Sequence, residues 1–193
     1  MEQQERSSWR PVVLLLALAA MPVLVATAMY FSGWRPSGDT SHGQLYRPAK
    51  PMSEFSLRRD DGSAFGLADL KGKWTLIYLL PSPCEAACVR ALYVMRMAHL
   101  GQGKEQDRVR RLVAGGTAEI AEIHRADPAL VALSGTAEEL QRLGAQMAME
   151  QDGGPRIYLA DPMGNLVLRF DPAADPAGLR KDLGHLLKHS WVG

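Results

Sequence analysis

A long hydrophobic run without a charged residue lies near the N-terminus. It extends from Pro11 to Phe31 with the sequence PVVLLLALAAMPVLVATAMYF. As one helix rising ~1.5 Å per residue, it would cross the ~30 Å hydrocarbon core of a membrane. Tyr30 and Trp34 lie where an interfacial aromatic belt is expected. The pattern predicts a transmembrane anchor over 11–31, preceded by a cytoplasmic segment, residues 1–10.

A cleaved signal peptide is the alternative interpretation of this run. Ala26-Thr27-Ala28 resembles a cleavage site of small residues. The run is longer than the hydrophobic part of an ordinary signal peptide, which favours the uncleaved anchor. Both interpretations export the rest of the chain, so the sequence places the remaining domain in the periplasm, at the inner membrane.

Strand and helix patterns alternate along the rest of the chain. Residues 32–52 are rich in Gly and Pro and predict a linker, followed by a domain over 53–193. The pattern after the linker predicts, in order, a hairpin around Arg59–Gly62, strand Trp74–Leu80, helix Glu85–Leu100, strand Leu112–Ala114, helix Thr117–Arg125, strand Pro128–Leu133, a helix from Thr136 to Leu143, strands Arg156–Ala160 and Leu166–Phe170, and helix Pro176–Lys188. This order predicts an α/β domain.

Composition narrows the possible functions. The formal net charge is +1, so no nucleic-acid surface is expected. About 150 residues remain after the anchor, enough for one domain with its own core. The two cysteines are too few for a disulfide-stapled scaffold.

The two cysteines, Cys84 and Cys88, follow the strand Trp74–Leu80 and open the helix Glu85–Leu100. The first turn of a helix presents free N–H groups and a positive dipole end, which favour a thiolate over a thiol. A thiolate attacks disulfides and binds soft metal ions such as Cu(I). The position of the pair therefore predicts either redox or copper chemistry. Glu85 would raise the pKa of a neighbouring thiol, and Arg90 would lower it by folding back.

The order of elements matches the thioredoxin fold, a central mixed sheet flanked by helices. That fold places a cis-proline against its cysteine pair, just before a late strand. Pro155 is the candidate here. An ordinary trans-proline at the start of an edge strand is the alternative.

The residues from Asp69 to Tyr78, the motif Cys84-Glu85-Ala86-Ala87-Cys88 and the segment Ile157 to Gly164 together resemble the Sco/SenC family. The resemblance covers roughly residues 53–188. It implies a membrane-anchored, thioredoxin-fold protein that helps to build the copper centre of cytochrome c oxidase. A respiratory oxidase subunit or its assembly factors would then be the partner.

One departure from that family concerns its copper site, which uses both cysteines and a histidine before the last hairpin. The equivalent position falls at about Gly153, and no histidine lies between Glu150 and Pro155. Thioethers suit Cu(I), which makes the nearby Met147 and Met149 substitute ligands or simply core residues. The histidines are poor substitutes: His99, His124, His185 and His189 are expected on helices away from the cysteines, whereas His42 in the linker would have to swing in.

Three functions remain open from the sequence. The first is thiol–disulfide exchange, with Cys84 attacking, Cys88 resolving and Pro155 shaping the groove for the partner. The second is a metallochaperone that carries Cu(I) between Cys84 and Cys88. The third is a docking module without catalysis, in which the cysteines form only a local disulfide.

Overall fold

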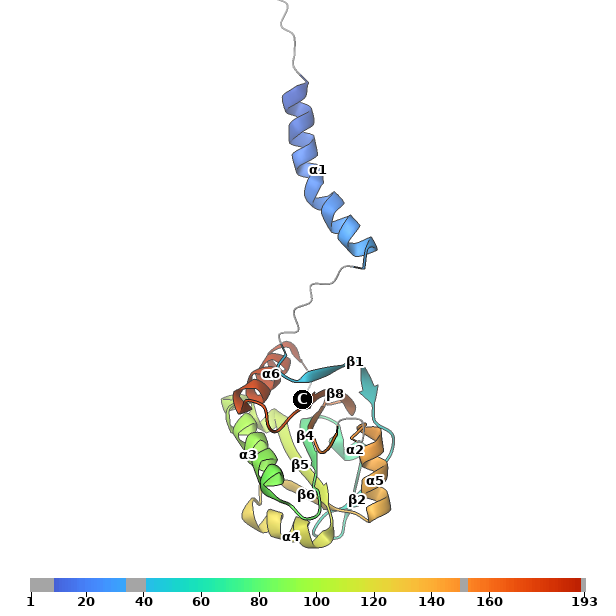
Figure 1. The fold of residues 1–193 in the computed structure, drawn as a ribbon, viewed down its shortest axis with the longest axis vertical. Coiled ribbons are helices and arrows are strands. Elements are labelled where there is room, and N and C mark those ends of the chain that lie inside the picture. The colour runs from blue at the N-terminus through green and yellow to red at the C-terminus, as the bar shows by residue number, and fades with distance from the viewer. Residues whose placement is uncertain (1–8, 34–40, 150–152, 192–193) are drawn as a thin grey trace, which may run out of the picture. The chain divides into compact units, whose positions relative to one another are not determined.

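The computed structural model describes residues 9–33, 41–149 and 153–191 (Figure 1). The chain divides into two compact units, Met1–Thr40 and Ser41–Gly193, each described here by itself.

The first unit contains one helix, α1 (Arg10–Phe31), with Pro22 in its interior. Its 22 residues would span roughly 33 Å. None of its residues is buried by protein, and it is long and apolar enough to cross a membrane. The helix thus has the length and composition of a membrane anchor, which a signal sequence shares.

The second unit is built on an eight-stranded mixed sheet with the order β1-β8-β7-β4-β5-β6-β2-β3. Strands β4, β5 and β6 are parallel to one another, and each of the other neighbouring pairs is antiparallel. The strands are β1 (Gln44–Pro51), β2 (Ser56–Arg58), β3 (Ala64–Gly66), β4 (Trp74–Leu79), β5 (Val109–Gly115), β6 (Val131–Ser134), β7 (Ile157–Ala160) and β8 (Asn165–Phe170).

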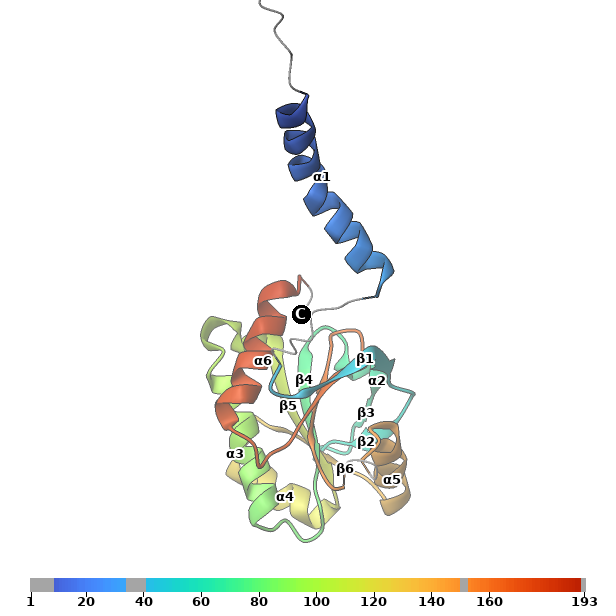
Figure 2. The ribbon, with the colours of Figure 1, turned by 45° about the horizontal axis from the view of Figure 1, so that its top comes forward.

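Helices cover both faces of this sheet (Figures 1 and 2). They are α2 (Leu67–Leu70), α3 (Ala86–Leu100), α4 (Thr117–Ala126), α5 (Ala137–Gln146) and α6 (Pro176–His189), with a 3₁₀ helix over Gly103–Arg108. Side chains of α3, α4 and α6 enter the core on one face, and those of α2 and α5 enter the core on the other. The mixed sheet between two helical layers confirms the predicted α/β architecture.

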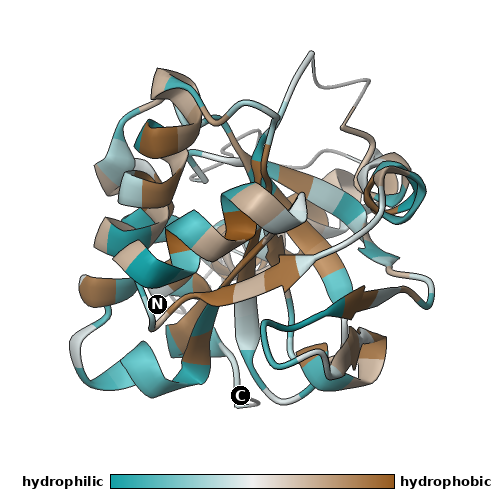
Figure 3. Ribbon diagram, turned by 90° about the horizontal axis from the view of Figure 1, so that it is seen from below, coloured by the Kyte–Doolittle hydropathy of each residue, from teal (hydrophilic) through white to brown (hydrophobic). Residues whose placement is uncertain are grey.

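The centre of the sheet is buried on both faces. All six residues of β4 are buried, and they alternate between the two cores: Leu76 and Tyr78 face α3, whereas Ile77 and Leu79 face α5. A run of apolar residues without alternation is typical of such a central strand. Figure 3 shows central strands that are mostly hydrophobic, between helices in which hydrophilic and hydrophobic residues are mixed. Helix α5 begins with the predicted capping box, in which Thr136 and Glu139 exchange hydrogen bonds.

The prediction that residues 32–52 form a linker is wrong for Gln44–Pro51, which form β1. The strand pairs with β8 at the edge of the sheet, and its register shifts between Leu45 and Lys50. Pro48 lies inside that irregular part. An edge strand tolerates proline because one side of its backbone needs no partner in the sheet. Residues 34–40 of the predicted linker lie outside the described part of the chain.

A buried ion pair ties α4 to the sheet. Arg111 of β5 is only 5 % exposed, and its guanidinium donates hydrogen bonds of 2.6 and 3.2 Å to the carboxylate of Asp127, directly after α4. These bonds hold the pKa of Asp127 below its ordinary value, mainly through the bond to Arg111. A depressed folded pKa means that the pair stabilises the fold above the ~3.9 of an unfolded aspartate. This stabilisation is lost as the pH falls through the lower folded pKa.

Replacing Asp127 by asparagine is expected to lower the free energy of unfolding by about 2–4 kcal/mol at pH 7, because the buried guanidinium loses its counter-charge. The loss should shrink towards pH 3. Urea unfolding at several pH values measures it. The matched control is Glu138→Gln, which breaks the exposed Arg142–Glu138 pair and should cost less than about 1 kcal/mol. Equal costs in both variants at pH 7 would contradict this account.

Candidate functional site

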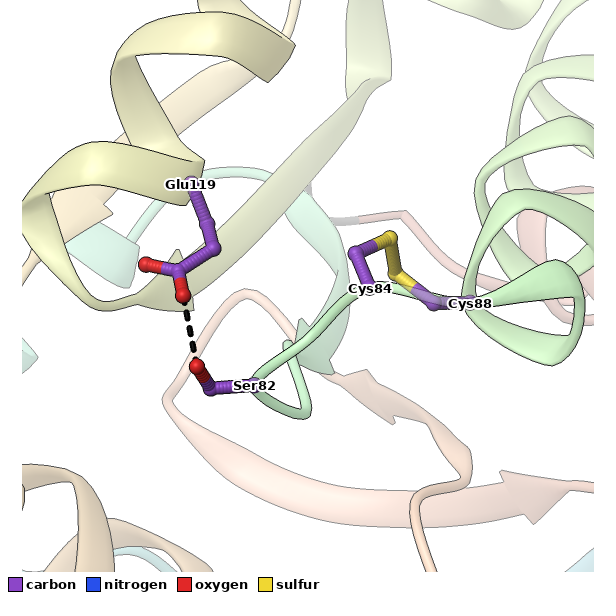
Figure 4. The surroundings of a disulfide bond; sticks show 4 residues. All are labelled: Ser82, Cys84, Cys88 and Glu119. Carbon is purple, nitrogen blue, oxygen red and sulfur yellow. Dashed lines mark hydrogen bonds between the residues drawn. A yellow bond between two sulfur atoms is a disulfide. The ribbon is translucent and has the colours of Figure 1, made fainter.

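The two cysteines lie beyond the carboxyl end of β4, where the chain turns into α3. They form a disulfide in this structure, with their Cα atoms 5.3 Å apart (Figure 4). Cys84 lies in the loop, one residue before the N-cap Glu85, and Cys88 is the third residue of α3. The structure therefore brings together the two cysteines that the sequence singled out.

The two cysteines differ in exposure. Cys88 is 1 % exposed and belongs to the core between α3 and the sheet, together with Tyr78 and Ala91. Cys84 is partly exposed and packs against the edge of that core. After reduction, Cys84 would be the sulfur that a large partner can reach, and Cys88 would lie behind it. The N–H groups of the first turn of α3 would favour the thiolate form.

A hydrogen bond fixes the loop before the cysteines to another helix. The hydroxyl of Ser82 donates a 2.6 Å bond to the carboxylate of Glu119, in the first turn of α4 (Figure 4). This bond holds the pKa of the Glu119 carboxyl below its ordinary value. The peptide bond between Ser82 and Pro83 is cis. Sequence reasoning missed the contact, because the two residues are 37 positions apart and no local pattern pairs them.

The charged residues beside the cysteines do not reach them. Arg90 hydrogen-bonds the carbonyls of Pro172, Ala173 and Ala174, so it holds the segment between β8 and α6 and does not fold back onto the thiols. Glu85 is exposed at the N-cap of α3 and its side chain makes no capping bond. Of the local groups considered in the sequence analysis, the N-terminus of α3 is therefore the one that would favour a thiolate over a thiol.

Pro155 lies at the same end of the sheet as the cysteines. Strand β7 runs antiparallel to β4 with Ile157 opposite Tyr78, so residues just before β7 lie near the carboxyl end of β4. The prediction of a cis bond before Pro155 is wrong: in the described part of the chain, the cis bonds precede Pro48 and Pro83. The peptide geometry of Pro155 is that of the alternative, a trans-proline before a strand.

The two glycines before Pro155 occupy the region in which the family resemblance places a copper-binding histidine. Gly153 and Gly154 have φ values of +69° and +140°, a backbone conformation that residues with a side chain rarely adopt. A Cβ atom at either position would meet nothing within 4 Å. The backbone of this turn therefore suits glycine and offers no side chain to a metal ion. Residues 150–152 lie outside the described residues.

The substitute ligands weighed in the sequence analysis lie elsewhere. Met147 is fully buried in the core on the α5 face, whereas Cys88 belongs to the core on the α3 face. Met149 packs against the same α5 core and lies near Gly144. The sheet separates these two core clusters, so the interpretation of Met147 as a core residue holds and that of a ligand does not.

The histidines are also engaged away from the cysteines. The Nδ1 atom of His42 lies 3.0 Å from a carboxylate oxygen of Asp182 in α6. His99 lies 3.2 Å from the carbonyl of Gln106, and burial is the main cause that lowers its pKa. His124 pairs with Asp60 at 3.3 Å. Across the residues that the structure describes, no three His, Cys, Asp or Glu side chains come together as a metal site.

Comparisons with known proteins agree with this fold. The copper-bound ScoI of Bradyrhizobium japonicum is 25 % identical, with a TM-score of 0.57 over 70 % of this chain and 98 % of its own. BsSco, a member of the Sco family of cytochrome c oxidase assembly proteins with a disulfide switch, is 15 % identical, with a TM-score of 0.59 over 79 % and 100 %. The thioredoxin domain of a thiol–disulfide oxidoreductase of Bacteroides vulgatus is 14 % identical, with a TM-score of 0.56 over 72 % and 96 %.

These neighbours confirm the thioredoxin-like fold and the predicted resemblance to the Sco/SenC proteins. A comparison with curated protein sequences finds no match. The family model for a transmembrane-like, thioredoxin-like C-terminal domain matches residues 74–190. That segment covers β4 to α6 and includes both cysteines, and the chain therefore belongs to the family of transmembrane-like, thioredoxin-like C-terminal domains.

Proposed function

We propose that this protein is a membrane-anchored thiol–disulfide exchange factor that acts on an exported protein during assembly of a respiratory oxidase. The observation that carries the proposal is the unequal exposure of the cysteine pair: Cys84 is partly exposed, and Cys88 is 1 % exposed behind it. Exchange through a mixed disulfide requires one sulfur that meets the partner and a second that attacks the first.

The proposed cycle begins with the reduced protein. The Cys84 thiolate attacks one sulfur of a partner disulfide, forms a mixed disulfide and expels the other partner sulfur as a thiolate. Cys88 then loses its proton and attacks the Cys84 sulfur, which closes the Cys84–Cys88 disulfide and releases the second partner thiolate. The partner disulfide gains the two electrons that the protein loses. Its two thiolates take up two protons, one from Cys88 and one from solvent, into which Cys84 released its proton when it became a thiolate. A dithiol reductant on the same side of the membrane returns the pair to its reduced form.

Three features of the described residues support this cycle. The Cα atoms of the pair are 5.3 Å apart in the closed disulfide, within the usual range for a disulfide. The bond between Ser82 and Glu119 holds the loop that carries Cys84. Pro155 precedes β7 at the end of the sheet where β4 leads to the cysteines, and there it would border the groove that receives the partner chain.

The location and the partner rest on other observations. Helix α1 has the length and composition of an anchor, and residues 1–10 before it would then lie in the cytoplasm. We infer that the domain faces the periplasm, attached to the inner membrane. The link to cytochrome c oxidase comes from BsSco, whose family has that role.

Transfer of Cu(I) by the same cysteines is the second candidate, favoured by the copper-bound ScoI neighbour. The side chains around the cysteines fit copper transfer less well than they fit thiol exchange. Reduction would provide two thiolates, which suit Cu(I), but the described residues bring no third His, Cys, Asp or Glu side chain to them. A docking module without catalysis is the third candidate.

The Cys88→Ser variant is expected to accumulate a mixed disulfide between Cys84 and its partner, because the resolving sulfur is gone. The Cys84→Ser variant should accumulate much less, since Cys88 is buried. Non-reducing electrophoresis of alkylated membranes, followed by mass spectrometry of the trapped species, measures both. The double serine variant is the control. Equal trapping by both single variants, or none by either, would contradict the proposed roles.

A Cu(I) titration separates exchange from copper transfer. The reduced full-length protein in detergent is titrated anaerobically against a competing chelator. Exchange predicts affinity no higher than that of a simple dithiol, because the described residues bring no third His, Cys, Asp or Glu side chain to the two thiolates. Tight one-to-one binding that disappears in Cys84→Ser would instead establish the metallochaperone.

Complementation of a deletion strain tests the docking alternative. Both exchange and copper transfer require the sulfur atoms, so Cys84→Ser and Cys88→Ser should each fail to restore oxidase activity. Immunoblotting of the membrane fraction controls for protein level. Full restoration by both serine variants would leave docking as the function.

A further inference from the structure

Two histidines lie side by side on the last two turns of α6, far along the chain from the cysteines. His185 and His189 are both exposed and are four residues apart, so they lie on one face of the helix. Their ring centroids are 4.6 Å apart and the ring planes are inclined by 58°. The proposed thiol exchange uses neither residue.

The distance between the rings suits a shared metal ion. An imidazole nitrogen binds such an ion at ~2.0–2.1 Å, which places the ring centroid roughly 3.2 Å from the metal. Two imidazoles at right angles around one ion would then have centroids about 4.5 Å apart. The observed 4.6 Å is close to this value. The same four-residue spacing on a helix provides the two histidine ligands of zinc proteases.

The surroundings of the pair are solvent and flexible cationic side chains. His189 is the last residue of α6, and the guanidinium of Arg108 donates hydrogen bonds to the carbonyls of Leu187 and Ser190 at this end, which offsets the negative end of the helix dipole. Lys181 and Lys188 are exposed on the same helix, on flexible side chains in solvent. Both imidazoles are themselves exposed, so a metal ion with its own water ligands can reach them.

We propose that His185 and His189 form a binding site for a divalent transition-metal ion, with Cu(II) as the ion bound most tightly. Imidazole suits copper, zinc and nickel, and the affinity of a given site rises to a maximum at Cu(II). The described residues supply no third side chain from His, Cys, Asp or Glu, so water completes the coordination. This site is independent of the cysteines, and its nitrogen donors suit Cu(II), whereas thiolates suit Cu(I).

The test uses the oxidised full-length protein in detergent, with the disulfide intact and no reductant, so that the thiols cannot bind the metal. Cu(II) is added and followed by calorimetry and by electron paramagnetic resonance, which counts coordinated nitrogen atoms. The parent protein should show two nitrogen ligands from imidazole. Zn(II) and Ni(II) should compete, and each should bind more weakly than Cu(II).

Single substitutions should remove the site. His185→Gln and His189→Gln should each weaken Cu(II) binding by at least the ~10–100-fold that loss of an outer-shell partner costs. The matched control is His124→Gln, which removes a histidine already paired with Asp60 and should leave the affinity unchanged. Binding at the amino terminus contributes equally to all variants and cancels in this comparison.

A spacing variant tests whether the four-residue separation of the two histidines is what allows them to bind Cu(II). Adding Lys181→His to His189→Gln restores two histidines four residues apart on the same exposed face, and binding should return. Circular dichroism confirms that α6 remains folded in each variant. The proposal is overturned if His185→Gln and His189→Gln bind Cu(II) as tightly as the parent, or if the spacing variant stays as weak as His189→Gln.

Discussion

Strand β4 is paired with parallel β5 on one side and with antiparallel β7 on the other, and every one of its six residues is buried. This double pairing fixes where the chain leaves the sheet and therefore where the cysteines lie. It also brings the turn before β7 to the end of the sheet at which β4 finishes, because an antiparallel neighbour starts where β4 ends. The first turn of α4 follows β5 at the same end, and its Glu119 accepts a hydrogen bond from Ser82 in the cysteine loop. The cysteine loop, the turn before β7 and the first turn of α4 therefore all lie at one end of the sheet, because β4 is central.

The two cysteines differ in exposure because one lies in a loop and the other in a helix. Cys88 lies on the inner face of α3, where its sulfur is covered by the core, whereas Cys84 precedes the helix and keeps partial contact with solvent. A symmetric pair would offer either sulfur to a partner. Here Cys84 is the more exposed of the two, so in the proposed exchange its sulfur would contact the partner first, and Cys88 would stay covered until the mixed disulfide forms. The same fold that buries Cys88 therefore assigns the order of the two steps in the proposed exchange.

Much of the fold could be predicted from local patterns, and the errors have physical reasons. The largely apolar run of β4, with Thr75 as its one polar residue, and the capping box at Thr136 indicate their elements directly. Strand β1 was missed because Pro48 and Pro51 are typical of a linker, and only its place at the sheet edge makes a strand there possible. The place of Pro155 just before a late strand could be inferred, but the geometry of its peptide bond depends on the surrounding fold. The hydrogen bond between Ser82 and Glu119 joins residues that are 37 positions apart, so no local sequence pattern indicates it.

The described part of the turn before β7 favours the proposed thiol exchange over copper transfer. Metal retention and disulfide formation compete for the same pair of thiolates, and an additional ligand shifts that competition towards the metal. In this chain the turn presents Gly153 and Gly154, whose backbone conformation disfavours any side chain, and the methionines nearest in sequence face the core around α5. With two thiolates alone, an oxidising compartment favours the closed disulfide. Nitrogen donors are instead gathered on α6, where they suit a harder ion than the sulfur atoms do, so the two sites would not compete for one oxidation state of copper.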